Sequence, residues 1–298
     1  MLRSLLKAMR PKQWAKNVFV YAGLFFDGKA FEPIWLWRST LAVLVFCLVS
    51  SAVYLINDLT DIDKDRLHPV KRHRPLASGA LRPSTARLAV AILLVASIGG
   101  ALAMDVAYGL HYWFAGTIVT YAGINYLYSV RLKNVVIVDV MTVAAGYVLR
   151  IFGGAAVVAV ARFSPWLYVC TTLGALFIAL NKRRHELLLL ADGANGHRSS
   201  LQDYSVRFVD EMTGLVASSA LVTYSFYTFS APNLPENHTM MLTIPFVIYG
   251  IFRYLFLIHN RNLGGAPEDV VLGDRPLITT FLLWALTAGL VLYGPTLF

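Results

Sequence analysis

The stretch LAVLVFCLVSSAVYLINDLTDIDKD, from Leu41 to Asp65, decides the fold class because a long apolar run ends directly in a cluster of acidic residues. On one helix turning about 100 degrees per residue, Asp58, Asp61 and Asp65 would lie within an arc of about 60 degrees. Asp63 would point elsewhere. Three carboxylates on one face repel one another unless a cation lies among them, and such oxygen ligands suit Mg²⁺ that carries a phosphate. The pattern predicts a site for a phosphorylated substrate at the end of a membrane helix.

The composition of the chain places it in a membrane. Its 298 residues are 57% hydrophobic and only 14% charged, which is too apolar for an ordinary soluble enzyme. A membrane-spanning helix needs about 20 mostly apolar residues, and such runs centre near residues 46, 95, 118, 147, 172, 221, 249 and 287. A shorter, aromatic ninth candidate covers Asn17 to Phe31. We therefore expect an all-α integral membrane protein of nine transmembrane helices, forming a single domain over residues 1–298.

The distribution of Lys and Arg predicts the orientation, because short cytoplasmic loops retain basic residues. When nine spans are counted, all but five of the 26 Lys and Arg residues fall on the side of the N-terminus. The exceptions are Lys29, Arg38 and Arg162 on the opposite side and Arg150 and Arg253 within predicted helices. We expect a multi-pass protein of the inner (plasma) membrane with a cytoplasmic N-terminus. The same bias accounts for the formal net charge of +9, so this charge does not indicate nucleic-acid binding.

Polar, Pro and Gly residues gather in two long connections on the cytoplasmic side, residues 57–85 and 181–211. We therefore expect the active site to face the cytoplasm. The second connection follows the sixth predicted span, which closes with Lys182, Arg183 and Glu186. These side chains are candidates for binding an anionic substrate, and the alternative is an ordinary positive-inside anchor.

Two further cytoplasmic helix ends carry candidate binding residues. Lys16 and Asn17 lie where the first helix enters the membrane, and the alternative there is interfacial anchoring with Trp14 at the headgroup level. Tyr128 and Lys133 lie at the end of another predicted span and are candidates by position only.

Asp139 and Arg150 fall inside a predicted membrane helix, where ionisable side chains are costly and need a partner. They are eleven residues apart, which is about 16 Å along a helix, so they cannot pair with each other. At least one of them needs a partner on another helix or on a ligand, and both alternatives stay open.

The penultimate connection holds three acids, Glu268, Asp269 and Asp274. Turn formation and helix capping are one interpretation. Contact with a substrate hydroxyl or a metal is the other.

The motif NDLTDIDKDR at Asn57–Arg66, continued by KRHRPLASG at Lys71–Gly79, resembles the UbiA superfamily of intramembrane prenyltransferases. The resemblance covers essentially the whole chain. It implies a nine-helix bundle with a cytoplasmic-side polar cavity that opens laterally to lipid. Typical members carry a second aspartate-rich motif where this chain has NKRRHE at Asn181–Glu186. This departure counts against ordinary prenyl transfer.

Within the superfamily the chain is most similar to the decaprenyl-phosphate phosphoribosyltransferase family. The matching motifs are RPxQWxKN at Arg10–Asn17, SAVYL at Ser51–Leu55, KRxxE at Lys182–Glu186 and PED at Pro267–Asp269. That family transfers phosphoribose from phosphoribosyl pyrophosphate to a polyprenyl phosphate. The resemblance implies the same two substrates and Mg²⁺ here, with the membrane as partner and no nucleic acid, and a homo-oligomer is left open.

The resemblance implies the metal ligands, and the roles of the basic residues are our own hypothesis. Asp58, Asp61 and Asp65 would bind Mg²⁺ with its pyrophosphate, and Arg66, Lys71 and Arg74 would neutralise the leaving group. Lys182 and Arg183 would hold the sugar 5-phosphate or the lipid phosphate. The other expected substrate contacts are Lys16, Asn17, Asn57, Tyr128, Lys133 and Glu186.

Two other functions are alternatives to phosphoribosyl transfer. One is transfer of an isoprenoid from its diphosphate to an aromatic or haem-like acceptor, on fold-level analogy. The other is transport that uses the midplane charges of Asp139 and Arg150, which is disfavoured because the polar groups crowd one side of the membrane.

Overall fold

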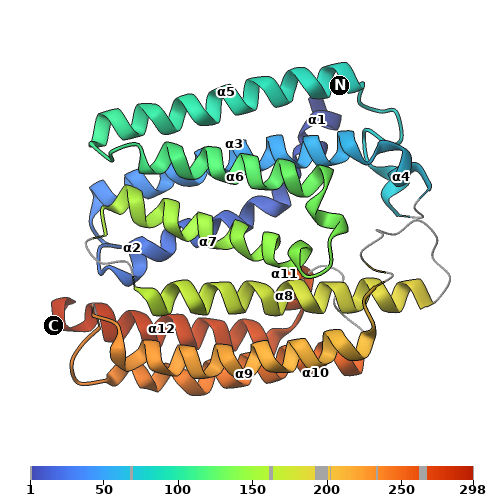
Figure 1. Ribbon diagram of the computed structural model, residues 1–298. Helices are drawn as coiled ribbons and strands as arrows, with labels where there is room; N and C mark the ends of the chain where they lie inside the picture. The colour runs from blue at the N-terminus through green and yellow to red at the C-terminus, as the bar shows by residue number, and fades with distance from the viewer. Residues whose placement is uncertain are drawn as a thin grey trace. The chain divides into compact units, whose positions relative to one another are not determined.

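The computed structural model describes residues 2–67, 70–160, 164–191, 201, 203–232, 234–261 and 267–297, and every regular element in these ranges is a helix (Figure 1). Arg162 lies outside the described residues. The chain divides into two compact units, one of Met1–Ala161 with Gly193–Ser200 and one of Arg162–Asp192 with Leu201–Phe298. Each unit is considered by itself below.

Unit 1 is built around the long helix α3 (Pro33–Thr60). The elements before it are α1 (Leu2–Met9), the 3-10 helix η1 (Pro11–Tyr21) and α2 (Ala22–Phe26). The elements after it are α4 (Ile62–Leu67), η2 (Lys71–His73), α5 (Pro83–Tyr108), α6 (Trp113–Val130), η3 (Leu132–Asn134) and α7 (Val138–Val158). Helices α5, α6 and α7 all pack against α3 (Figure 1).

The core of unit 1 is aromatic and aliphatic. Phe46 on α3 is fully buried and packs edge-on against Phe114 and Tyr121 of α6, with ring centroids 6.1 and 5.6 Å apart. α3 and α5 each begin with a proline in their first turn, where the missing N–H costs no hydrogen bond. Burial of large side chains is the main stabilising term for such a core.

Two glycines of α7 allow neighbouring elements to approach its backbone. A Cβ on Gly154 would lie 1.9 Å from the carbonyl oxygen of Val20 in η1, and a Cβ on Gly153 would lie 2.8 Å from the ring of Phe46. Small residues at helix contacts permit such close packing in membrane proteins. The close approach of η1 to α7 matters because it brings Asn17 of η1 against this helix.

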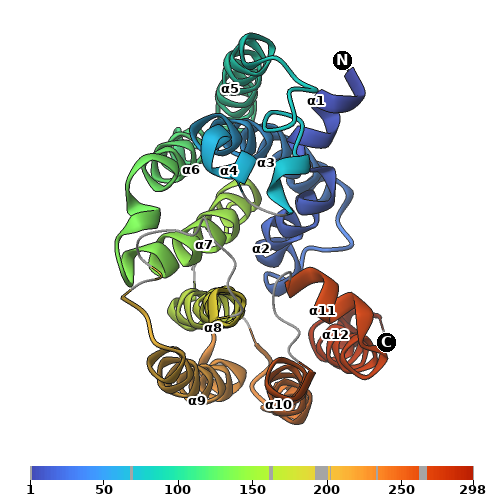
Figure 2. The same cartoon turned by 90° about the vertical axis from the view of Figure 1, so that its right-hand side faces the viewer.

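Unit 2 comprises α8 (Pro165–Ala191), α9 (Val206–Ser230), η5 (Thr239–Thr243), α10 (Ile244–Arg261), α11 (Pro267–Gly273) and α12 (Arg275–Leu297). α8 packs along α9, and α10 packs on α12. Figure 2 shows these long helices nearly end-on. Phe177, Leu257 and Ile258 lie in its buried core.

Five described helical segments are long and apolar enough to cross a membrane: Pro33–Thr60, Pro83–Tyr108, Val138–Val158, Thr239–Arg261 and Arg275–Gly294. Helices α6, α8 and α9 coincide with three more of the runs expected from hydropathy. The ninth expected run, from Asn17 to Phe31, is not one helix, because η1 ends at Tyr21 and α2 ends at Phe26. The membrane character is therefore clear, whereas the count of nine spans stays a prediction.

Candidate active site

The three aspartates do not lie on one continuous helix, so that expectation is wrong. α3 ends at Thr60 and α4 begins at Ile62, with Asp61 between them at φ −106° and ψ 12°. In Figure 2, α4 is seen at the near end of α3. The repulsion among the three carboxylates is offset by basic side chains, because every one of them has at least one cationic partner.

Arg74 nevertheless brings two of the aspartates together. One of its terminal nitrogens donates to Oδ1 of Asp58 at 3.2 Å and to Oδ2 of Asp65 at 2.7 Å. Both carboxylates are buried, with exposed fractions of 1% and 4%. A shared guanidinium at this depth offsets the cost of burying the two charges.

Two more cations complete the cluster. Arg10, in the bend between α1 and η1, forms an ion pair with Asp58. Lys133 in η3 is only 3% exposed, and its Nζ lies 2.5 Å from Oδ1 of Asp61. The cluster of Asp58, Asp61 and Asp65 with these cations is called the aspartate cluster below. Its ion pairs join residues 48 and 72 positions apart in the sequence, so the site depends on the tertiary fold.

Arg10 was not among the residues expected to bind substrate. Its backbone is left-handed, with φ 55°, a conformation that costs roughly 1 kcal/mol or more for a residue other than glycine. Its guanidinium lies 5.0 Å from the ring centroid of Tyr54. The RPxQW and SAVYL motifs therefore meet here, and Trp14 Nε1 likewise donates to Ser51 Oγ at 3.0 Å. The sequence feature that could have drawn attention to Arg10 is the proline that follows it, because Pro11 restricts the backbone where η1 begins.

The other candidates of unit 1 near the cluster differ in exposure. Asn57 precedes Asp58, and its Oδ1 is buried without a hydrogen-bond partner in the structure. Lys71 is half-buried in η2. Arg66 is exposed, its Nη1 is paired with Asp63 at 3.2 Å, and its Nε donates to the carbonyl oxygen of Ala77 at 3.4 Å. Asn57 thus offers an unused acceptor, whereas Arg66 would have to reorient to reach a leaving group.

Three further candidates lie on η1 and α6. Lys16 and Tyr128 are half-buried. Asn17 is fully buried, and its Oδ1 accepts a hydrogen bond of 2.8 Å from Nε of Arg150. Asn17 is therefore turned towards the interior of unit 1 and positions another side chain.

The basic motif of unit 2 lies within a helix and does not end it. α8 continues to Ala191, beyond Lys182, Arg183 and Glu186. Arg183 is 2% exposed, and its Nη1 lies 2.6 Å from Oε2 of Glu186, one turn further on. Asn181, next to it, is fully buried with an unpartnered Oδ1.

Of the three acids in the penultimate connection, Asp274 has a defined structural role, and the side chain of Glu268 lies outside the described residues. Asp274 Oδ1 accepts the backbone N–H of Leu277 at 3.0 Å, which caps the start of α12, and Asp274 also pairs with Arg253 at 2.9 Å. This confirms the capping interpretation for Asp274. The hydrogen bond from Arg253 holds the pKa of the Asp274 carboxyl below its usual range, with help from the Leu277 N–H.

Within the described ranges, no three His, Cys, Asp or Glu side chains are arranged to hold a metal ion by themselves. Protein-bound Mg²⁺ usually has one or two carboxylates and takes its other ligands from water and substrate phosphates. The buried carboxylates and the unpartnered Oδ1 of Asn57 fit such an open site. The adjacent Arg and Lys side chains suit the phosphate oxygens that would accompany the ion.

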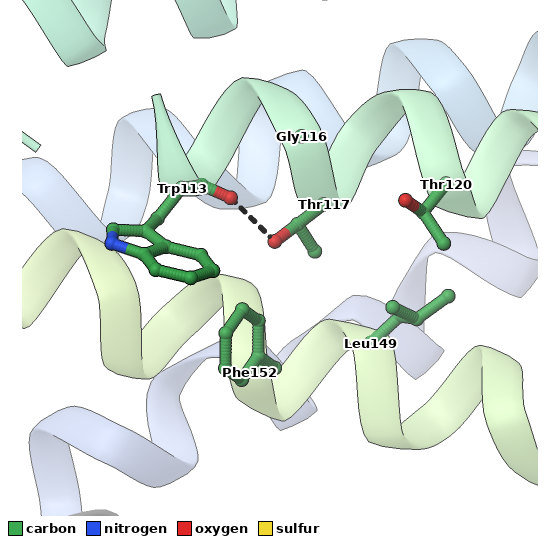
Figure 3. Close-up of a pocket in the computed structure, with 6 residues that line it drawn as sticks. All are labelled: Trp113, Gly116, Thr117, Thr120, Leu149 and Phe152. Carbon is green, nitrogen blue, oxygen red and sulfur yellow. Dashed lines mark hydrogen bonds between the residues drawn. The ribbon is translucent and has the colours of Figure 1, made fainter. Parts of the chain in front are cut away.

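A separate hollow of about 230 Å³ lies between α6 and α7 and is lined by Trp113, Gly116, Thr117, Thr120, Leu149 and Phe152 (Figure 3). None of these six residues is charged. The hydroxyl of Thr117 is already used, since it donates to the carbonyl oxygen of Trp113 at 2.7 Å. This hollow does not have the composition of the polar cavity that the sequence predicts.

Comparison with known proteins identifies the family. The model of the UbiA prenyltransferase family matches residues 17–268. The chain belongs to this family. It is therefore a membrane-embedded transferase, and its family membership argues against transport as its main activity.

Two proteins that are similar to this UbiA family member share one name. The decaprenyl-phosphate phosphoribosyltransferase of Mycolicibacterium smegmatis is 32% identical over 306 residues, covering 98% of this chain and 93% of that protein. The decaprenyl-phosphate phosphoribosyltransferase of Corynebacterium glutamicum is 31% identical, covering 97% of this chain and 86% of that protein. Among solved structures, a UbiA homolog from Archaeoglobus fulgidus bound to DMAPP and Mg²⁺ superposes with a TM-score of 0.74 at 18% identity, covering 97% of this chain and 99% of that one. This last likeness concerns the fold alone.

Proposed function

We propose that this protein transfers 5-phosphoribose from phosphoribosyl pyrophosphate to a polyprenyl phosphate and releases pyrophosphate. The observation that carries the proposal is the aspartate cluster, in which the buried Asp58 and Asp65 and the partly exposed Asp61 form ion pairs with Arg10, Arg74 and Lys133. The names of the similar mycobacterial and corynebacterial proteins support the same reaction.

A mixed cluster of carboxylates and cations suits a metal-bound pyrophosphate better than either charge alone. Carboxylates bind the metal, and guanidinium groups bind phosphate oxygens in a fixed, forked geometry. Without such a ligand, the two kinds of side chain neutralise each other. We therefore interpret the ion pairs of Asp58, Asp61 and Asp65 as the resting contacts of a site that exchanges partners when the donor binds.

The reaction is a single displacement at the anomeric carbon of the ribose. A phosphate oxygen of the lipid forms the new bond to this carbon, while the bond to the pyrophosphate oxygen breaks and pyrophosphate leaves with the electron pair. Mg²⁺, when bound, supplies Lewis-acid stabilisation of the leaving pyrophosphate. Asp58, Asp61 and Asp65 would hold it, and Asn57 would supply a further oxygen.

The basic residues would stabilise charge that develops on the leaving group. Arg10 and Arg74 are the best placed, because both already contact Asp58. Lys71 and Lys133 would act beside them, and Arg66 would need to leave Asp63. Lys16 and Tyr128 would contact substrate at the same end of unit 1.

We assign the motif on α8 to the second phosphate of the reaction, which is either the sugar 5-phosphate or the lipid phosphate. Lys182 and Arg183 supply the positive charge, and Glu186 orients Arg183 through their ion pair. The surrounding architecture would be the expected nine-helix bundle, with a polar cavity that faces the cytoplasm and opens to lipid. A polyprenyl tail can then remain in the bilayer while its phosphate meets a water-soluble donor.

The deciding experiment incubates the purified full-length protein with labelled phosphoribosyl pyrophosphate and polyprenyl phosphate, with and without Mg²⁺. A parallel reaction contains an isoprenoid diphosphate and an aromatic acid. We expect labelled lipid only in the first reaction and only with Mg²⁺. Product only in the second reaction would replace the proposal with prenyl transfer.

A further inference from the structure

Arg150 lies in the middle of the membrane-spanning helix α7 and is only 5% exposed. Its Nε donates to Oδ1 of Asn17 at 2.8 Å, one terminal nitrogen donates to the carbonyl oxygen of Gly146 at 2.8 Å, and the other donates to the hydroxyl of Tyr121 at 2.7 Å. These partners come from η1, α6 and α7 itself. The guanidinium is therefore fixed in one orientation.

All three hydrogen-bond partners of Arg150 are neutral. Its other described contacts are with the rings of Tyr121 and Tyr147, whose centroids are 4.9 and 5.5 Å away. In the part of the chain that the structure describes, no carboxylate lies within ion-pairing distance of this guanidinium, and Asp139 is not among its contacts. Aromatic rings offset a buried positive charge only in part. Among arginines in other candidate spans, Arg253 has a carboxylate partner in Asp274, whereas Arg38, near the start of α3, lies over the rings of Trp35 and Tyr108.

The hydrogen bonds of Arg150 leave part of the guanidinium unused. A guanidinium has five N–H groups, and the contacts above occupy three of them, one on each nitrogen. One N–H on each terminal nitrogen remains, which is the forked pair that binds phosphate. Asn17 is itself held, because its Nδ2 donates to Cys47 Sγ at 3.2 Å and to Ser50 Oγ at 3.5 Å. The donor is thus fixed in place before any ligand arrives.

The position of Arg150 connects it with the aspartate cluster. Ser50 and Asp58 are two turns apart on α3, which is about 12 Å by the helical rise. Tyr54 lies between them on the same helix, with the guanidinium of Arg10 over its ring. A polar path of Asp58, Tyr54 and Ser50 therefore follows α3 from the cluster to the level of Arg150.

We propose that Arg150 is the cation of a further anion-binding site within unit 1, which takes whichever phosphate monoester of the reaction the α8 motif does not bind. This inference rests on the proposed function, because both substrates of that reaction carry such a group. The phosphate is either the 5-phosphate of the donor or the phosphate of the polyprenyl acceptor. Arg150 thereby selects a phosphorylated ligand over its neutral counterpart. The phosphate supplies a negatively charged partner, which offsets the cost of an arginine within a membrane helix.

The test measures ligand affinity of the purified full-length protein in lipid nanodiscs. One arm compares ribose 5-phosphate with ribose, and the other compares a polyprenyl phosphate with the corresponding polyprenol. Arg150→Gln should weaken binding of one of the two phosphates by about tenfold or more, while binding of both neutral ligands stays the same. Binding of Mg²⁺-pyrophosphate, which reports on the aspartate cluster, should change by less than about threefold.

Two further variants serve as controls for Arg150→Gln. Arg253→Gln removes an arginine of another candidate span, one that is paired with Asp274, and should leave all affinities unchanged. Arg150→Lys keeps the charge but loses the fork, so it should recover part of the lost phosphate affinity, and it carries the test if Arg150→Gln does not fold. Unchanged affinities for both phosphates in the folded Arg150 variants would overturn the inference and leave the proposed function intact. Loss of phosphate binding in a protein that makes no ribosylated lipid would overturn the proposed function alone.

Discussion

The charged clusters of the two units are built differently. In unit 1, the aspartate cluster recruits Arg10 and Lys133 across 48 and 72 positions of sequence, and its members are mostly buried. In the α8 motif of unit 2, Arg183 pairs with Glu186 one helical turn away, and the neighbouring Arg184 pairs with Asp210 of α9, 26 positions away. A local pair forms as soon as the helix does, whereas distant buried pairs require the whole unit to be assembled. The costly arrangement of unit 1 is the stronger sign of a functional site.

The largest expected effect tests the cluster of unit 1 at its centre. Asp58→Asn should lower turnover by at least about 1000-fold, because Asp58 contacts both Arg10 and Arg74 and would bind the metal. Product formation from labelled donor measures this loss, and circular dichroism checks the fold. The control is Asp63→Asn, five positions away, where the native side chain is 93% exposed and should be dispensable. Equal turnover in the two variants would remove the functional distinction between buried and exposed aspartates.

A smaller effect should follow from removing the most distant cation of the cluster. Lys133→Met leaves Asp61 without its Nζ partner and should reduce turnover by about 100-fold and stability by about 1–3 kcal/mol, since Asp61 is partly exposed and can take up water. Turnover and thermal unfolding are measured together. Lys64→Met, which removes an exposed lysine of α4, is the matched control. A Lys133 variant with wild-type turnover would show that the pair serves the fold alone.

The corresponding change in unit 2 should be milder. Arg183→Gln breaks the pair with Glu186 and should raise the KM of one phosphorylated substrate by about tenfold, with less effect on kcat. Kinetics with each substrate varied in turn decide which phosphate is affected. Arg207→Gln removes another local pair, which is exposed on α9, and should leave both constants unchanged. If Arg183→Gln behaved in the same way, the motif of α8 would be a membrane anchor and not a binding site.

The difference between the units also explains what the sequence could reveal. Hydropathy located most helices, and the acidic motif located the aspartate cluster, because both are local patterns. The break of the helix at Asp61 was not predictable from periodicity, since the partners that accompany it, Arg74 and Lys133, come from other elements. The pairing of Arg150 with Asn17 spans 133 positions, and no spacing rule relates the two. The sequence required only that Asp139 or Arg150 find a partner on another helix or on a ligand.

The smallest expected effect concerns the pH dependence of unit 2. The hydrogen bond from Arg253 lowers the pKa of Asp274 in the folded protein. The carboxylate therefore contributes stability above its unfolded pKa of about 3.9, and this contribution is lost as the pH falls through the lower, folded value. Thermal unfolding of the wild type and of Asp274→Asn should differ at neutral pH, begin to converge at about pH 4 and coincide only below the folded pKa of Asp274. Glu236→Gln, at an exposed position of the same unit, should follow the wild type throughout. A constant difference between the wild type and Asp274→Asn would mean that capping of α12, and not the charge of the Arg253 pair, sets the contribution of this aspartate.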